Sequence, residues 1–462
     1  MKRVQGFRGT GARSPRGTGA QAHGRTGALA LLVLGVVIVL AAPLAAQQQS
    51  ATSAPQTAVV AIRNATIVPV VGPRIPNGTI VLWGGRIEAV GAGVSVPADA
   101  QVIDGTGLFV YPGLIDSGTR LGLTEISSVP GGEDTQELGN FNPHDDALSA
   151  VNPSSEIIPT VRVNGVTTAL ISARGGVIAG QAALVDLAGF TPQEMAILPR
   201  AGMVITFPRV RTGRRFGGEG GAQGDEAQAE EVRRQTRALR EYLAGAKAYA
   251  DIKARLAGGA PGTQEANLPM EAMVPVMRGE SPVILDVETA EQIRGALALV
   301  DSFHLKVIFR GARFAWQLAD TLAARQIPVI VGPTVAAPDD RDAYDAVYAY
   351  PGVLARAGVK IAFQTDNASD SRNLAYNAGI STAYGLDPEE ALRAITINAA
   401  QIWGVADRYG SLEAGKVANV IVTSGDVLDA RTDIRYVFIR GQLQPRDDRN
   451  TRLYNQFRAR PR

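Results

Sequence analysis

The sequence predicts an α/β fold in which a closed barrel of alternating strands and helices is joined to a small β-rich unit. From Val161 onward, short apolar runs alternate with helical stretches, a pattern typical of parallel strands that are buried on both faces. β-like runs separated by Gly, Pro and Asn turns precede this region and return after Leu412. At 462 residues, 45% of them hydrophobic, the chain is long enough to favour a closed barrel over an open doubly wound sheet.

The first 46 residues have the pattern of a secretory signal peptide. All six Lys and Arg residues of this segment lie before the apolar run 28–42, and small residues follow it up to Ala46. We therefore expect cleavage after Ala46 and export to the periplasm. An uncleaved N-terminal membrane anchor stays open, because residues 28–46 are just long enough to span a bilayer.

Charge outside this leader gives no reason to expect nucleic-acid binding. Without the six basic residues the net charge falls from +2 to −4, so the basic balance belongs to the leader alone. A lipid-anchored lipoprotein is excluded, since the chain has no cysteine to acylate. No membrane contact beyond the leader is expected.

The domain order follows from the composition along the chain. Residues 47–57, rich in Gln, Ser, Thr and Ala, are expected to form a linker, and residues 58–112 the first part of a β-rich unit. The expected strands of this part are residues 59–62, 66–70, 79–83 and 86–90. The second part is expected over residues 411–444, with strands at 420–423 and 436–441, and residues 445–462 as a frayed polar tail.

The region between these two parts, residues 113–410, is expected to form the barrel. Its strand candidates are residues 167–171, 203–206, 282–285, 306–309, 328–331 and 359–363, with helices at 289–302 and 314–325. An insertion at 207–265 contains a Gly- and Arg-rich stretch and then a charged helix over 225–256, which we interpret as a surface helix.

Two residue counts limit the chemistry. The absence of cysteine excludes disulfides, thiolate metal sites and cysteine nucleophiles. Only three histidines occur, and His23 lies in the leader, which leaves His144 and His304. No Gly-x-Ser-x-Gly motif is present, so a serine nucleophile is not expected either.

Three segments resemble the amidohydrolase superfamily, and most closely its imidazolonepropionase-like and related exported members. They are residues 105–116, residues 352–366 together with 385–400, and residues 410–419. The resemblance implies a (β/α)8 TIM-like barrel with a β-sandwich built from both chain ends. It also implies hydrolysis of non-peptide carbon–nitrogen bonds by one or two divalent metals such as zinc. In the third segment the family usually has Asp where this chain has Asn419.

The metal ligands that the resemblance implies are largely replaced. The family has His-x-His after strand one, a His after strands five and six, and an Asp after strand eight. This chain has Gly118 and Arg120 in the first motif, Asp286 after strand five and Arg310 after strand six, and it keeps Asp366. Glycine has no side-chain donor and arginine stays protonated, so we expect no metal and no other cofactor.

These replacements predict an ion-pair cluster of Arg120, Arg310, Asp286 and Asp366 at the carboxyl ends of the strands, with Gly118 beside it. Such a pocket suits a small ligand that bears a carboxylate. Asp366 is either a general base without metal or a structural carboxylate. A Mg²⁺ or Ca²⁺ site of Asp286, Asp366 and Glu125 remains an alternative.

A glycine-rich stretch, residues 175–181, follows a strand and adds a second candidate feature. It is either an anion-binding loop or a tight loop at the end of the strand. Two functions stay open: a hydrolase with an altered mechanism, and a non-catalytic pseudoenzyme that binds a small, anionic ligand or a protein partner. Assembly into a homo-oligomer also stays open.

Overall fold

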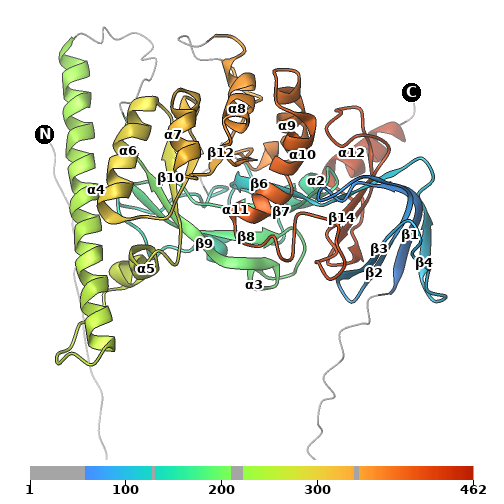
Figure 1. The fold of residues 1–462 in the computed structure, drawn as a ribbon, viewed down its shortest axis with the longest axis horizontal. Helices are drawn as coiled ribbons and strands as arrows, with labels where there is room; N and C mark the ends of the chain where they lie inside the picture. The colour runs from blue at the N-terminus through green and yellow to red at the C-terminus, as the bar shows by residue number, and fades with distance from the viewer. Residues whose placement is uncertain (1–57, 127–128, 130, 210–221, 338–342, 461–462) are drawn as a thin grey trace, which may run out of the picture. The chain divides into compact units, whose positions relative to one another are not determined.

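The computed structural model describes residues 58–126, 129, 131–209, 222–337 and 343–460. They form two eight-stranded sheets and the helices that cover them (Figure 1). The expected leader and linker, residues 1–57, lie outside the described residues, as do residues 210–221 of the insertion. Among the described residues no helix is both long and apolar enough to cross a membrane.

The first sheet is built from both ends of the chain. It contains β1 (Val60–Ile67), β2 (Ile75–Trp83), β3 (Arg86–Gly91), β4 (Gln101–Asp104), β5 (Phe109–Pro112), β14 (Val420–Thr423), β15 (Ile434–Ile439) and β16 (Gln442–Leu443). β5 pairs antiparallel with β14, with Tyr111 opposite Ile421. Neither segment alone has all the strands of this sheet, so its core, including Ile62 and Phe438, needs both. The expected composite β domain is confirmed.

The second sheet contains eight strands in chain order. They are β6 (Leu114–Thr119), β7 (Val166–Ile171), β8 (Ile178–Asp186), β9 (Ala196–Thr206), β10 (Val283–Val287), β11 (Val307–Gly311), β12 (Val329–Val331) and β13 (Ile361–Phe363). The first and last strands meet where the backbone N–H of Asp366 donates to the carbonyl of Gly118 at 2.8 Å. The sheet is therefore a nearly closed barrel, as the sequence predicts.

One strand departs from the expected alternation of strands and helices. β8 runs antiparallel to both β7 and β9, so the barrel is parallel except at this strand. Only residues 172–177 join β7 to β8, and a crossover between parallel strands needs a dozen residues or more. The sequence analysis missed β8 because it treated Gly175 to Gln181 as a loop, whereas Gly180 and Gln181 lie within the strand.

Helices cover the outside of the barrel. They are α1 (Ala147–Ala150), α2 (Ile157–Arg162), α3 (Pro192–Met195), α5 (Leu268–Met277), α6 (Ala290–Phe303), α7 (Ala319–Ala324), α8 (Ala346–Arg356), α9 (Leu374–Thr382), α10 (Pro388–Ala394) and α11 (Ile397–Ile402), with 3-10 turns η1 (Ala315–Leu318) and η2 (Ser369–Asn373). α6 shows why such segments become helices. Thr289 and Gln292 form a reciprocal capping box at its start, and Ile293, Ala296 and Val300 form its buried face.

The insertion forms the long helix α4 (Ala222–Ala257), which stands at the edge of the barrel in Figure 1. Leu239, Leu243, Ala246 and Ala250 are buried and spaced three to four residues apart, so they form one apolar stripe. That stripe faces α5 and α6. The interpretation of a surface helix with one buried face therefore agrees with the described part of α4.

The sequence analysis expected a frayed C-terminal segment, but most of this segment is helical. Arg449–Arg458 forms α12, and the Asp448 carboxylate accepts the N–H groups of Asn450 and Thr451 at 2.8 and 3.2 Å. These two bonds satisfy backbone donors that a helix start otherwise leaves unpaired. A cap of this kind stabilises a short helix even though none of its residues is buried.

A buried polar network joins the barrel to the first sheet and explains the unusual Asn419. The Asp186 carboxylate, at the end of β8 and fully buried, accepts from Asn419 Nδ2 at 2.7 Å and from Arg440 Nε at 2.8 Å. Burial raises the pKa of Asp186, while the charge of Arg440 opposes the shift. An aspartate at position 419 would oppose a second carboxylate here, so an amide is the better partner.

Candidate functional site

Side chains inside the barrel change from apolar to polar near the ends of the strands. Ile284 and Ile308 belong to the apolar interior, and two residues further on lie Asp286 and Arg310. The same step on neighbouring strands leads from Leu170 to Ser172, from Val204 to Thr206 and from Ala362 to Gln364. Because alternate side chains of a strand face the same side, these polar residues form one layer at the barrel mouth.

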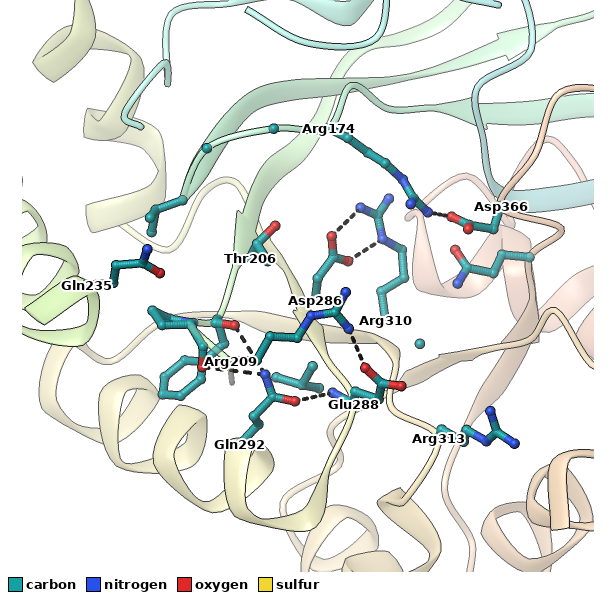
Figure 2. A pocket seen from close by; sticks show the side chains of 18 of the residues that line it. Arg174, Thr206, Arg209, Gln235, Asp286, Glu288, Gln292, Arg310, Arg313 and Asp366 are labelled. Atoms are coloured by element: carbon teal, nitrogen blue, oxygen red, sulfur yellow. Dashed lines mark hydrogen bonds and ion pairs between the residues drawn. The ribbon is translucent and has the colours of Figure 1, made fainter. Parts of the chain in front are cut away.

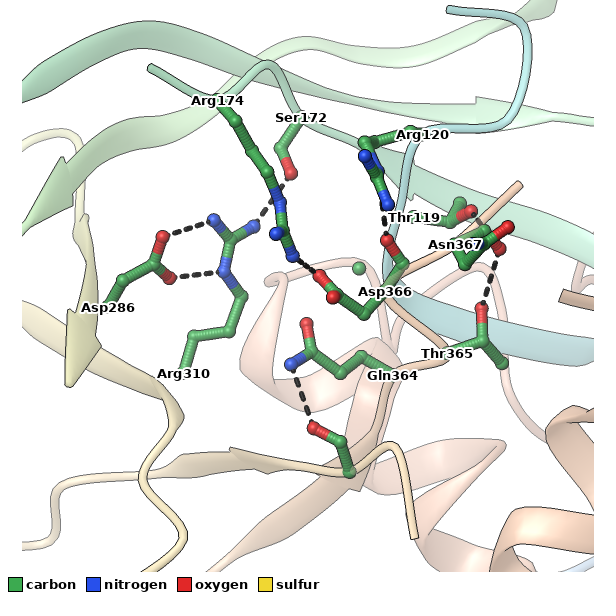
Figure 3. Close-up of polar contacts among 12 residues, drawn as sticks. Thr119, Arg120, Ser172, Arg174, Asp286, Arg310, Gln364, Thr365, Asp366 and Asn367 are labelled. Atoms are coloured by element: carbon green, nitrogen blue, oxygen red, sulfur yellow. Dashed lines mark hydrogen bonds and ion pairs between the residues drawn. The ribbon is translucent and has the colours of Figure 1, made fainter. Parts of the chain in front are cut away.

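Asp286 and Arg310 form the most buried ion pair of this layer (Figure 3). They are register partners on β10 and β11. Arg310 Nε and Nη2 donate to the two Asp286 oxygens at 2.5 and 2.8 Å, and Nη1 donates to Ser172 Oγ at 2.7 Å. Arg310 is only 4% exposed. This planar, two-bond arrangement holds the cation firmly at the centre of the mouth.

Asp366 lies beyond β13 and pairs with an arginine that the sequence analysis did not name. Its backbone has a φ of +64°, donates to Gly118 and accepts from Arg120 Nε at 3.2 Å. Its carboxylate forms an ion pair with Arg174, which lies in the loop between β7 and β8. The expected cluster is therefore two separate ion pairs, and Arg120 contacts the backbone of Asp366, not its carboxylate.

Gly118 and Gln364 fit against each other. A Cβ atom on Gly118 would lie 2.5 Å from Gln364 Oε1, too close for any side chain there without movement of the glutamine. Gln364 Nε2 donates to the Gly332 carbonyl at 3.0 Å, whereas its Oε1 has no partner within the described part of the chain. Gln364 thus fills the space beside the first strand.

The arginines at the mouth lie close enough to affect one another. Burial, together with the charges of Arg310 and Arg120, lowers the pKa of Arg174 to about 10. The Arg174 backbone is fixed by a 2.6 Å bond from its N–H to the Thr135 carbonyl. This crowding of cations means that an additional anion at the mouth is electrostatically favourable.

A fully buried carboxyl beneath the mouth ties the first strand to the segment after the last. Asp116 accepts from Thr365 Oγ1 at 2.5 Å, from Thr365 N at 3.2 Å and from Gly118 N at 3.1 Å. Burial raises the pKa of Asp116 to about 7, although each of these bonds lowers it. Asp116 therefore positions Gly118 and the residues next to Asp366.

The mouth opens into a cavity of about 820 Å³ (Figure 2). Arg174, Asp286 and Asp366 line one side, and Arg209, Glu288 and Arg313 line another. α4 contributes Gln228, Glu231 and Gln235. Arg209 forms an ion pair with Glu288. A concave, polar cavity of this size suits a small molecule with charged groups.

The residues at the mouth do not fit the divalent metal that the resemblance implies. Gly118 has no side-chain donor, and both oxygens of Asp286 already accept from Arg310. The guanidinium groups of Arg174 and Arg310, which both line the cavity, would repel a dication. Among the described residues no three His, Asp or Glu side chains are grouped as metal ligands, and Glu125 instead accepts from Asn152 at 3.3 Å.

Neither remaining histidine lies at the mouth. His144 is exposed in a loop before α1, with Nε2 3.7 Å from Asp145 Oδ1. His304 is the exposed C-cap of α6 and precedes β11, so it lies at the opposite end of the strands. No metal site of the family's type can be assembled from them.

The glycine-rich stretch lines the cavity at Gly175, Gly176 and Val177, and part of its backbone is bonded to a neighbouring loop. The N–H groups of Val177 and Ile178 both donate to the Asn140 carbonyl, at 2.7 and 2.9 Å. Gly175 and Gly176 have φ values of +100° and +63°, which allow the tight turn. Residues 175–177 therefore form a tight connection between β7 and β8, and residues 178–181 belong to β8. Anion binding by this stretch stays a prediction.

Sequence reasoning missed Arg174 and Gln364. Gln364 has a signal, because it lies two residues beyond the apolar Ala362 of a predicted strand and must face the same side. Arg174 lies in a loop without a recognisable motif, and nothing local indicates that its side chain points to Asp366. Only the three-dimensional arrangement identifies it.

The chain resembles known proteins in sequence and in fold. Residues 323–443 match the sequence model of the amidohydrolase family. These residues, about a quarter of the chain, are therefore similar to the amidohydrolase family. Imidazolonepropionase from Pseudomonas putida strain GB-1 is 42% identical over 72 residues, and that from Acinetobacter baumannii strain AB307-0294 is 43% identical over 79. These matches cover 15% and 16% of this chain and 18% and 20% of the relatives, so they span about a fifth of each relative.

Solved structures share the fold over most of the chain. An amidohydrolase from Thermotoga maritima has a TM-score of 0.74 and 25% identity, and the match covers 84% of this chain and 100% of that one. A molinate hydrolase has a TM-score of 0.52 and 18% identity, with 88% and 98% covered. The amidohydrolase-type barrel and its β domain are therefore shown.

Proposed function

We propose that this amidohydrolase-family protein binds a small carboxylate-bearing molecule at the barrel mouth and has lost the metal-dependent hydrolysis of its family. The observation that supports the proposal is the pair of Arg310 and Asp286. They stand where the resemblance implies two histidine ligands, and Arg310 brings a permanent positive charge to a place that would otherwise hold a cation.

Arginine changes what this place can do. A guanidinium group remains protonated at neutral pH and cannot generate hydroxide, but it binds carboxylates through two parallel bonds. Arg174 and Arg120 add further positive charge around the same cavity. Asp366 then serves as an ion-pair partner rather than as a catalytic residue, and no metal or other cofactor takes part.

We also propose that the protein is exported to the periplasm. The support is the order of basic, apolar and small residues in the leader. Mass spectrometry of the exported protein should show an N-terminus at Gln47. An intact N-terminus in the membrane fraction would instead indicate that the leader is a membrane anchor.

Binding calorimetry tests the proposed ligand class. Pentanoate and pentanamide have the same carbon chain, but only pentanoate has a negative charge. Pentanoate should bind at least about tenfold more tightly, as one charge-assisted bond implies. Arg174→Gln should remove this preference. Arg325→Gln is the matched control, because Arg325 pairs with Asp301 at a C-cap away from the mouth.

Two results would contradict the proposal. One is equal affinity for pentanoate and pentanamide in the unmodified protein. The other is a loss of binding in Arg325→Gln as large as that in Arg174→Gln, since it would show that general destabilisation removes the binding.

A further inference from the structure

The two ion pairs at the mouth differ in how easily a ligand can open them. Arg310 is almost fully buried, bonded to both oxygens of Asp286 and to Ser172, so its guanidinium is fixed. The side chains of Arg174 and Asp366 are 44% and 30% exposed. Both of them line the cavity and are held through their backbones, which leaves the side chains free to turn apart.

A ligand that carries only a carboxylate would leave one member of this second pair without a partner. To bind Arg174 it must displace the Asp366 carboxylate, which would then face the cavity without a cation. Arg120 meets Asp366 through a bond from Nε to the backbone carbonyl, and no bond from Arg120 to the Asp366 carboxylate is formed in the described part of the chain. A ligand that also brings a cation would keep both residues paired.

Near Asp366, Gln364 provides an acceptor that has no partner within the described part of the chain. Gly332 offers a carbonyl, which can only accept, so the Gln364 group that bonds to it is the amide nitrogen and the orphaned atom is Oε1. The residue is 4% exposed and lines the cavity. Its Oε1 lies against Gly118, 2.5 Å from the position that a Cβ atom there would take. Only an N–H or O–H donor satisfies such an atom.

We propose that the mouth binds a zwitterion of the α-amino-acid class, whose carboxylate takes Arg174 and whose ammonium group takes Asp366 and turns a donor toward Gln364 Oε1. This rests on the proposed function and narrows its ligand class. Without a ligand, Arg174 and Asp366 pair with each other. On binding, each of them pairs instead with the opposite charge of the ligand. No bond is made or broken in this exchange.

Three probes that differ only in their charged groups separate the contributions of the two charges. L-norvaline has both charged groups, pentanoate lacks the ammonium group and butylamine lacks the carboxylate. Calorimetry on the full exported chain should give norvaline the tightest binding, by about tenfold over pentanoate and more over butylamine, which corresponds to about 1.4 kcal/mol at 25 °C.

The variant Asp366→Asn should change the affinities for pentanoate and norvaline in different ways, which a merely structural role of Asp366 would not do. It removes the internal competitor for Arg174, so pentanoate should bind more tightly than in the unmodified protein. It also removes the partner of the ammonium group, so the preference for norvaline over pentanoate should disappear. Gln364→Leu should reduce that preference by a few fold, and the matched control Asp301→Asn should change neither affinity.

The outcomes distinguish this inference from the proposed function. If pentanoate binds as tightly as norvaline to the unmodified protein, the zwitterion inference is wrong while carboxylate binding stands. An equal weakening of both ligands by Asp366→Asn would also overturn it, because it would mean that Asp366 only stabilises the mouth. If neither carboxylate binds, both proposals fail.

Discussion

Removing the Asp286 carboxylate should destabilise the barrel more than removing any similar surface carboxylate. In Asp286→Ala the Arg310 guanidinium, whose side chain is 5% exposed, keeps only its bond to Ser172. Breaking a buried ion pair from one side costs about 3–5 kcal/mol. Because the Asp286 side chain is itself 27% exposed and admits water, we expect a loss near the lower end of that range.

Two further variants separate the charge from the packing. Asp301→Ala removes the same group from an exposed pair. Asp301 accepts two bonds from Arg325, at 2.8 and 3.2 Å, just as Asp286 accepts two bonds from Arg310. Exposed pairs contribute at most about 1 kcal/mol. The double variant Asp286→Ala with Arg310→Met removes both charges and should recover most of the loss, since an apolar replacement leaves no buried ion unpaired.

Urea denaturation followed by tryptophan fluorescence measures these differences as midpoints, compared at equal slope. The reasoning is refuted if Asp286→Ala shifts the midpoint no more than Asp301→Ala does. It is also refuted if the double variant is as unstable as the single one, because the loss would then come from packing and not from an unpaired charge.

Three other variants test particular contacts, each by its unfolding temperature. Gly118→His should destabilise the barrel, because its Cβ would meet Gln364 Oε1, and Gln364→Ala should restore part of the loss; no recovery would mean that the clash lies elsewhere. With its pKa raised to about 7, Asp116 keeps a proton in the folded chain that the unfolded chain releases at about pH 4. The unfolding temperature should therefore fall between about pH 4 and 7 and then level off. If it falls as steeply with pH in Asp116→Asn, other groups cause the effect. Asn419→Asp should lower stability at pH 7 by at least about 2 kcal/mol, because it opposes the buried Asp186, whereas an unchanged temperature would show that the network tolerates a second carboxylate.

Much of the fold follows from the sequence because its cause is local. Within the predicted strands 282–285 and 306–309, residues 283–285 and 307–309 are apolar and buried on both faces. Continuous apolar runs identify such strands without knowledge of their neighbours. β8 escaped detection because its first residues belong to a glycine-rich stretch that is typical of a loop. Asp448 is a residue type that favours the start of a helix, but the polar composition of the tail led to the expectation of a frayed end.

The site divides in the same way. Asp286 and Arg310 lie at equivalent places on neighbouring parallel strands, so their pairing follows from the register. The partner of the Asp366 carboxylate could not be predicted. Arg174 reaches it from the loop between β7 and β8, which is far away in the sequence, and Arg120 instead meets the backbone of Asp366. Side chains from loops depend on the path of the whole loop, which no short motif defines.

The metal content of the purified protein tests the central claim most directly, namely that ion pairs occupy the place of the family's metal. The protein is incubated with zinc, dialysed and measured by elemental analysis, beside Asp286→Ala and Asp366→Ala. We predict zinc far below one equivalent per chain, with no difference between the three proteins. One or two tightly held equivalents, lost in either variant, would contradict the account.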